Sequence, residues 1–200
     1  MRIVLEGLQW ELRTGETLAA IPEEIDVRFL CIRGTDLGIP CWTALARSPV
    51  MRSVQTLCLE SCGLTDAATT LLFNSQPLPK LKSLHLCNRE GIPAGRLNRL
   101  TDQTALTLAN STMLPNLHEL DLWNTAVGDL GWDAIANSPH LAKLDSAYAW
   151  GTQLTAACAQ KIKLESHLRR INTPRRDPPL SMCWYHTDYD ERTITWTEDY

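Results

Sequence analysis

Apolar and polar residues alternate in short runs along this chain, and the runs share the spacing L-x-x-L-x-L. Such alternation is typical of a β-strand that buries one face. The last apolar positions of successive runs are 27 residues apart three times and then 36 apart, at Leu5, Ile32, Leu59, Leu86 and Leu122. A degenerate copy, "LAKLDSAYAW", places Ser146 at this position, 24 residues further on. The pattern predicts one strand for each repeat.

A second apolar series keeps step with the first and predicts a helix after each strand. Its members lie 13 residues after a strand position or 14 before the next one, at Leu18, Leu45, Leu72, Leu108 and Ile135. Side-chain oxygens that can accept a free backbone N–H predict the helix N-caps, at Thr65, at Thr101 or Asp102, and at Thr155. Strands joined by such helices must run parallel.

The long repeat contains nine extra residues between Leu86 and Leu108, and the segment "REGIPAGRLNRL" is the best place for them. This segment carries three arginines, Arg89, Arg96 and Arg99, against one glutamate. One interpretation is a solvated loop. The other is a basic contact segment beside the strands, because loops that interrupt a regular period often bind partners.

Residues 57–66, "LCLESCGLTD", together with the in-phase copies, resemble the leucine-rich repeat family, in its long ribonuclease-inhibitor-like and cysteine-containing classes. The resemblance covers about residues 2–171 and defines the predicted repeat domain, residues 1–171. It implies an α/β fold: a right-handed solenoid of about six repeats, with a parallel concave sheet and helices on the convex side. The family serves many functions, so the resemblance alone does not give one.

The two ends depart from the repeat. Residues 172–200 are expected to form a capping segment, because prolines end the last helix and "SMCWYHTDYDERTITWTEDY" predicts two short strands around "DYDE". This hairpin is expected to pair with or pack beside the last repeat, with Trp184 and Trp196 near the closing surface; the alternative is a disordered acidic tail. The first strand begins almost at Met1, which leaves its edge uncovered unless a partner, a missing segment or local charges protect it.

Strand alternation also predicts which side chains face a partner, since those between the leucines point to the concave face. The face changes from neutral or basic in its first half to acidic around Trp123. A tryptophan among carboxylates has the composition of a hot spot for a basic partner. The candidate partner-binding residues are Phe29, Arg33, Cys58, Glu60, His85, Glu119, Asp121, Trp123, Lys143 and Asp145.

Cysteine and histidine chemistry is the main alternative on this face. Cys31, Cys58, His85 and Cys87 carry zinc-ligand atoms, but residues on neighbouring parallel strands point side by side and no C-x2-C pair is present. A Cys58–His85 catalytic pair lacks a nucleophile motif. The sequence therefore predicts no metal, no cofactor and no enzyme. In "CLESC", Cys58 is expected to point to the concave face and Cys62 into the core. Cys62 is therefore interpreted as a structural residue, and only Cys58 stays open to a functional role.

Composition narrows the partners. The net charge of −4 argues against nucleic acid, and no apolar run approaches the roughly 18 residues of a membrane span. Seven cysteines, an odd number, indicate reduced thiols and an intracellular location, cytoplasmic or nuclear. The predicted function is a non-catalytic protein–protein interaction module, a scaffold or adaptor, without a small-molecule substrate.

Two other functions stay open. One is a structural subunit held in a larger assembly, which the uncovered first strand would favour. The other is the substrate-recognition part of a ubiquitin ligase, by family analogy only. The segment "IPEEIDVRFLCI" is faintly similar to the start of an F-box, but Val27, Leu30 and Ile32 are in phase with the repeat strands, so the repeat interpretation is preferred.

Overall fold

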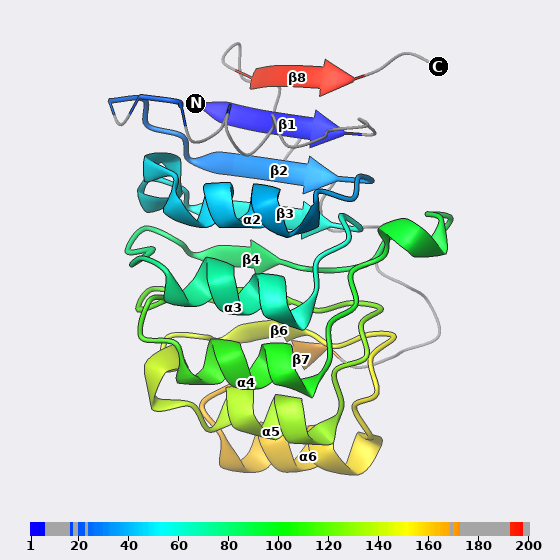
Figure 1. The fold of residues 1–200 in the computed structure, drawn as a ribbon. Helices are drawn as coiled ribbons and strands as arrows, with labels where there is room; N and C mark the ends of the chain where they lie inside the picture. Colours follow the sequence, from blue (N-terminus) through cyan, green and yellow to red (C-terminus); the bar gives the residue numbers. More distant parts are fainter. Residues whose placement is uncertain (7–16, 18–19, 23, 169, 173–192, 198–200) are drawn as a thin grey trace.

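The computed structural model describes residues 1–6, 17, 20–22, 24–168, 170–172 and 193–197. Within them, seven parallel strands follow one another in chain order across a single sheet, and an eighth strand is added beside the first (Figure 1). The strands are β1 (Arg2–Glu6), β2 (Phe29–Arg33), β3 (Thr56–Glu60), β4 (Ser83–His85), β5 (Glu119–Asp121), β6 (Ser146–Tyr148), β7 (Arg170–Asn172) and β8 (Thr193–Thr197). The predicted α/β class with a parallel sheet is confirmed.

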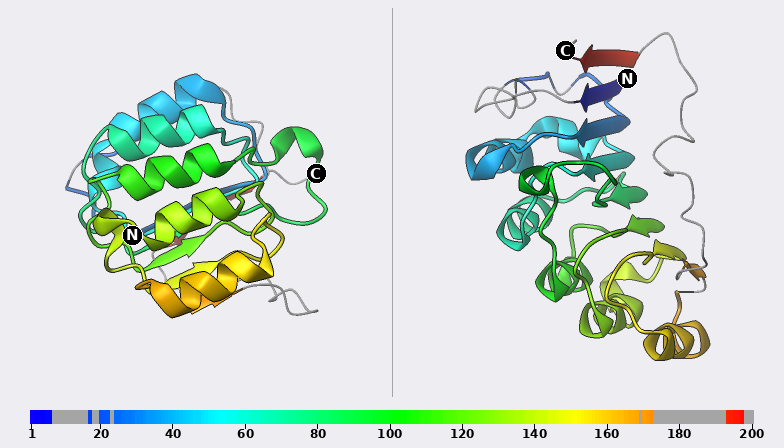
Figure 2. Two further views of the ribbon diagram at one scale, coloured as in Figure 1. Left: turned by 90° about the horizontal axis from the view of Figure 1, so that it is seen from below. Right: turned by 90° about the vertical axis from the view of Figure 1, so that its right-hand side faces the viewer.

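The helices between these strands all lie on one face of the sheet (Figure 2). They are α2 (Gly38–Arg47), α3 (Asp66–Asn74), α4 (Asp102–Asn110), α5 (Asp129–Ala136) and α6 (Ala156–Glu165), with short 3-10 helices η1 (Pro49–Arg52), η2 (Ala94–Arg96) and η3 (Pro139–Leu141). We call the opposite face of the sheet, which the helices do not cover, the open face. None of the helices in the described residues is long and apolar enough to cross a membrane.

The core lies between the sheet and the helices. Leu30, Leu57, Leu84 and Leu120 are Cα partners in successive strands, so they form one continuous row of fully buried leucines. Burying each such side chain contributes about 1.5–3 kcal/mol, and no single strand–helix unit has a second apolar surface to bury it against. Stability therefore comes from contacts between neighbouring units. The large side chains that complete this core are Trp42, Phe73 and Trp132.

Three helices begin at the predicted caps. The hydroxyl of Thr65 accepts a hydrogen bond from the N–H of Ala68, that of Thr101 from Gln103, and that of Thr155 from Cys158. For α4 this settles the open choice in favour of Thr101, with Asp102 as the first helical residue.

Aspartates at the first position of three helices connect each unit to the next one, a feature that we call the carboxylate ladder (Asp66, Asp102 and Asp129). Asp66 accepts hydrogen bonds from the N–H and the hydroxyl of Thr101, at 3.0 and 2.7 Å. Asp129 accepts the same pair of bonds from Thr155, at 2.7 and 2.8 Å. Asp102 accepts one from the N–H of Gly128, at 2.6 Å. The first turn of each helix thus fixes the start of the following helix.

The sixth strand lies three residues later than the sequence predicts. Asp121 pairs with Tyr148, which places Ala149 rather than Ser146 at the repeat position of Leu122 and restores the 27-residue spacing. The error arose because Leu144 was aligned with Leu120. Leu144 instead corresponds to Leu117, which precedes the strand and is equally buried.

The chain end also differs from the prediction. The expected hairpin was placed beside the last repeat, but β8 pairs in parallel with β1, at the opposite edge of the sheet, with Arg2 opposite Thr193 and Glu6 opposite Thr197 (Figure 1). The first strand therefore has a partner from its own chain. Most of the predicted capping segment, including Trp184 and the "DYDE" turn, lies outside the described residues.

The carboxylate ladder predicts a pH-dependent contribution to stability. Burial raises the pKa of Asp66, but hydrogen bonds from Thr104 and Thr101 outweigh burial, so the pKa lies below the ordinary value of 3.8. Replacing Asp66 by Asn keeps one acceptor and removes the charge. We expect a loss of about 0.5–1 kcal/mol in the free energy of unfolding at neutral pH, small because the carboxylate is partly exposed.

A lowered folded-state pKa stabilises the protein above the unfolded value and loses this effect as the pH falls through the folded value. The difference between wild type and Asp66→Asn, from urea unfolding at a series of pH values, should therefore shrink below pH 3.8. Asp145→Asn is the matched control, because Asp145 is exposed and outside the ladder. A difference that is constant across this pH range would contradict the assignment.

Candidate functional site

Strand register brings most of the predicted partner-binding residues together on the open face. Phe29, Thr56, Ser83 and Glu119 form one row across four strands. Cys31, Cys58, His85 and Asp121 form the next row, and Arg33 lies opposite Glu60. As far as β5, these rows place the predicted residues on one face, as strand alternation predicts. Trp123 lies two residues after the end of β5, and its backbone N–H donates to Asp121 of the second row.

Two predicted residues do not belong to this face. Lys143 and Asp145 precede β6, and both are exposed. The N–H of Asp145 donates to the carbonyl of His118, in the segment that leads into the sheet. This correction follows from the three-residue shift of the sixth strand. The residues that take the places of Lys143 and Asp145 are Ser146 and Tyr148.

Charged side chains on the open face are more buried than a solvated binding surface would be. Glu60 is 2% exposed, Asp121 4% and His85 7%. Buried charges are stable only when they are paired or hydrogen-bonded. Nδ1 of His85 lies 3.6 Å from a carboxylate oxygen of Asp121, and Nε of Arg33 lies 4.0 Å from Glu60. These ionisable side chains therefore interact with one another within the face and are not uniformly solvated.

The first half of the face is built around apolar and basic groups. The guanidinium of Arg2 stacks on the ring of Phe29, 4.1 Å from its centroid. Val4, Cys31 and Cys58 form a small buried cluster against Phe29, separate from the main core. Arg33 donates from Nε and Nη2 to the sulfur of Cys31, both at 3.3 Å.

The second half contains carboxylates and large aromatic rings. The rings of Trp123 and Trp150 lie 5.4 Å apart at an angle of 56°. Asp121 accepts a hydrogen bond from the backbone N–H of Trp123 at 2.8 Å, and Glu119 accepts one from the hydroxyl of Ser83 at 3.2 Å. We name the group Glu119, Asp121, Trp123, Tyr148 and Trp150 the acidic–aromatic cluster.

Tyr148 and Trp150 were missed in the sequence because of the same misaligned strand. A strict 27-residue step from Asp121 and Trp123 reaches both, so the spacing contained the signal. Burial raises the pKa of the Tyr148 hydroxyl, and the negative charges of Glu119 and Asp121 raise it further. The carboxylates of the cluster thus lie near the half-buried rings of Tyr148 and Trp150, an arrangement that favours a cation.

Two asparagines close the base of the long repeat. The side-chain oxygen of Asn88 accepts the N–H of Asn98 at 2.7 Å, and the Asn88 amide donates to the Asn98 carbonyl at 2.9 Å. The nine extra residues, 89–97, therefore form a loop whose two ends are joined by these hydrogen bonds. The short helix η2 lies within this loop (Figure 1). This places the insertion inside the segment that the sequence predicts.

The side chain of Asn98 also forms hydrogen bonds with backbone groups of three neighbouring turns. Its buried side-chain oxygen accepts the N–H groups of Cys62 and Leu64, at 2.9 and 3.0 Å. Its amide donates to the carbonyls of Leu59, Leu86 and Cys87, at 2.7, 3.0 and 3.2 Å. One side chain therefore holds together β3, β4 and the end of the insertion.

The three loop arginines differ in their contacts. Arg96 donates to the carbonyl of Gly34 at 3.1 Å, so it attaches the loop to the turn after β2. The N–H of Arg89 donates to the hydroxyl of Ser61 at 2.7 Å, and its side chain is half-buried. Arg99 is exposed. The insertion is thus packed against the preceding turns, and Arg99 presents its charge to solvent.

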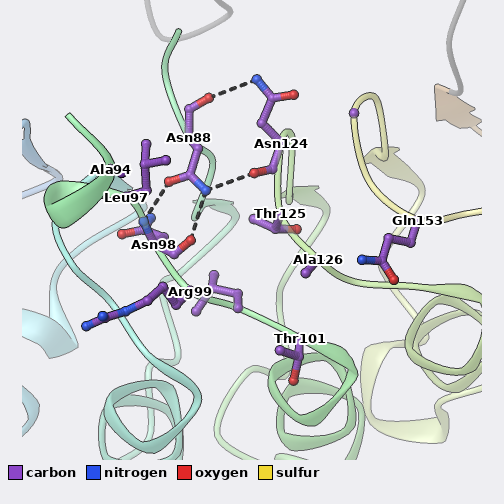
Figure 3. Close-up of a pocket in the computed structure, with 12 residues that line it drawn as sticks. Asn88, Ala94, Leu97, Asn98, Arg99, Thr101, Asn124, Thr125, Ala126 and Gln153 are labelled. Atoms are coloured by element: carbon purple, nitrogen blue, oxygen red, sulfur yellow. Dashed lines mark hydrogen bonds between the residues drawn. The ribbon is translucent and has the colours of Figure 1, made fainter. Parts of the chain in front are cut away.

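A hollow of about 450 Å³ lies beside the insertion, at the turns that follow the strands (Figure 3). Figure 3 shows Asn88 and Asn124 linked at its rim, with the Asn88 amide directed at the Asn124 carbonyl, 2.8 Å away. Its other walls come from Ala94, Leu97, Arg99, Ala126 and Gln153. The hollow is broad, and the side-chain amides of Asn88 and Asn98 in its wall are already engaged in hydrogen bonds within the protein.

Comparisons with known proteins return no matching family model and no matching curated protein. Across the described ranges, no group of three or more His, Cys, Asp or Glu side chains is placed to hold a metal ion. The open face and the insertion therefore have to be interpreted from their own geometry.

The contacts of Asn98 predict a large effect of its removal. In Asn98→Ala, five buried backbone groups would lose their partner, and we expect the free energy of unfolding to fall by about 3 kcal/mol or more. Urea unfolding monitored by circular dichroism gives this value. Asn110→Ala is the matched control, because Asn110 is exposed and makes one bond, to the Leu106 carbonyl. Equal losses in the two variants would contradict the role given to Asn98.

Proposed function

We propose that the chain is a leucine-rich-repeat-type solenoid and a non-catalytic protein-interaction module that binds a basic partner at the acidic–aromatic cluster. The solenoid is supported by strands in strict chain order and by helices on one face of the sheet. The 27-residue step from Leu30 to Leu57 to Leu84 in adjacent strands, and the side-chain contacts that join successive turns, support it further.

The cluster is the observation that carries the proposed partner chemistry. The half-buried ring of Trp150 lies 5.4 Å from that of the buried Trp123, whose backbone N–H donates to Asp121, so aromatic surface and negative charge belong to one site. A Lys or Arg side chain gains from each: its cation is attracted by a ring face and by a carboxylate, and its methylene stem packs on the rings. An acidic partner would be repelled by the carboxylates and would gain no cation–π attraction from the rings.

The rest of the open face supplies a neutral to basic surface, on which Arg2 and Phe29 are stacked. A partner segment that crosses the strands would thus meet two different surfaces, which fixes its direction. An intracellular setting, cytoplasmic or nuclear, fits the odd number of cysteines in the sequence, seven.

The alternative functions have less support. The structural-subunit hypothesis drew on an uncovered first strand, and β8 pairs with that strand. The ubiquitin-ligase hypothesis stays a prediction from resemblance alone. The interaction module is favoured because carboxylates and aromatic rings in one cluster suit a basic protein segment.

A phage-displayed library of linear peptides with randomised sequence tests the partner chemistry directly. We expect selected peptides to be enriched in Lys and Arg, and their affinity, measured by fluorescence polarisation, to fall as salt is raised. Trp150→Ala should weaken binding about tenfold or more, because aromatic anchors dominate such interfaces. Trp150 is chosen over Trp123 because it is only half-buried, so its removal disturbs the fold less.

Lys143→Ala and Asp145→Asn are the matched controls, since both residues lie outside the open face, and they should bind as the wild type does. Selection of acidic or purely apolar peptides would overturn the proposal. So would a Trp150→Ala protein, folded by circular dichroism, that binds a selected basic peptide with unchanged affinity.

A further inference from the structure

Two cysteines lie side by side on the open face, away from the acidic–aromatic cluster. Cys31 and Cys58 are Cα partners in the parallel strands β2 and β3. Neighbouring strands are about 4.8 Å apart, which falls within the roughly 4.4–6.8 Å between Cα atoms that a disulfide spans. Both belong to the small cluster with Val4 and Phe29, so their side chains leave the sheet in the same direction.

A cation contacts one member of this pair. Nε and Nη2 of Arg33 both donate to the sulfur of Cys31, at 3.3 Å. A guanidinium in contact with a thiol favours its thiolate, which is the nucleophilic form. On the other side of the pair, His85 is the Cα partner of Cys58 in β4, and its ring lies beside Asp121. Cys31 thus contacts an arginine from its own strand, and Cys58 lies opposite a histidine in the next strand.

The other cysteines provide an internal contrast. Cys62 is fully buried, and its thiol donates to the oxygen of Asn98 at 3.6 Å. Burial raises the pKa of Cys62 well above its ordinary value. Burial and the carboxylate of Asp129 likewise raise the pKa of Cys158. The sulfurs of Cys62 and Cys158 thus contact an amide oxygen and a backbone carbonyl, whereas that of Cys31 contacts a guanidinium.

We propose that Cys31 and Cys58 form a peroxide-reactive dithiol, in which Cys31 attacks and Cys58 resolves. The Cys31 sulfur attacks one peroxide oxygen: an S–O bond forms, the O–O bond breaks, and the departing hydroxide takes up the thiol proton as water. The Cys58 sulfur then attacks the sulfenic sulfur of Cys31: an S–S bond forms, the S–O bond breaks, and a second water leaves. The two thiols lose two electrons and two protons, and the peroxide is reduced to two waters.

Burial makes the pair selective for small oxidants. Cys31 is fully buried and Cys58 is 1% exposed, while the helices cover only the other face (Figure 2). A small, uncharged peroxide enters such a site more readily than a bulky disulfide reagent. A disulfide between adjacent parallel strands is strained, so a dithiol reductant should open it easily. The modification is thus reversible, and the thiols are the resting form.

The test is graded hydrogen peroxide on the native protein, followed by acid quenching, alkylation of the unfolded protein and peptide mass spectrometry. We expect a Cys31–Cys58 crosslink, with loss of two hydrogens, at doses that leave Cys62 and Cys158 unmodified, and full reversal by dithiothreitol. In Cys58→Ala the Cys31 sulfenic acid should persist and be trapped by dimedone. In Cys31→Ala, Cys58 should survive the same dose.

Arg33→Gln should slow crosslinking about three- to tenfold for each unit by which the thiol pKa rises. A higher pKa leaves less of the thiol as thiolate, but each thiolate is then a stronger nucleophile, which offsets part of the loss. Arg33→Lys, which keeps the charge, should recover part of the rate. Thermal unfolding must show that each variant is folded; where alanine fails this check, serine replaces it. Oxidation of Cys158 or Cys62 before the pair, dimedone labelling at another cysteine, or an unchanged rate in folded Arg33→Gln would each overturn the proposal.

Discussion

Each strand–helix unit of this protein has one apolar stripe and no means of burying it alone. The stripe is covered only when the next unit repeats the same spacing, so the 27-residue step is a packing requirement as well as a sequence pattern. In the sheet, the row from Leu30 to Leu120 meets this packing requirement. At the polar ends of the helices, the carboxylate ladder supplies the hydrogen bonds between neighbouring units. Where nine residues are added, Asn88 and Asn98 join the ends of the insertion, so the step continues undisturbed.

The elements whose signal is local and strongly apolar could be predicted from the sequence. Leucine spacing located the first five strands, and the threonine caps located the starts of three helices. The sixth strand could not be located in the same way, because alanines replace its leucines and Leu144 gave a stronger signal nearby. The place of β8 could not be predicted either, since its partner, β1, lies at the far end of the sequence.

The candidate site was predicted in part for the same reasons. Alternation put Asp121, Glu119 and Trp123 on the correct face, but the shifted strand exchanged Tyr148 and Trp150 for two exposed residues. Burial was a further surprise, because a polar residue between strand leucines suggests a wet surface. His85 and Asp121 are instead nearly inaccessible and paired with each other. Sequence patterns give the direction of a side chain, whereas its exposure depends on contacts with the whole chain.

The pairing of β8 with β1 has a consequence for the order in which the molecule is made. Ribosomes release the amino terminus first, so β1 emerges long before Thr193–Thr197, the segment that completes its hydrogen bonds. Contacts between the ends of a chain also close slowly, because their loop-closure entropy must be overcome first. Until Thr193–Thr197 has been made, the edge of β1 is an open acceptor for any extended strand. A chaperone would find its most exposed backbone there, and a nascent copy would be most prone to mispair at that edge.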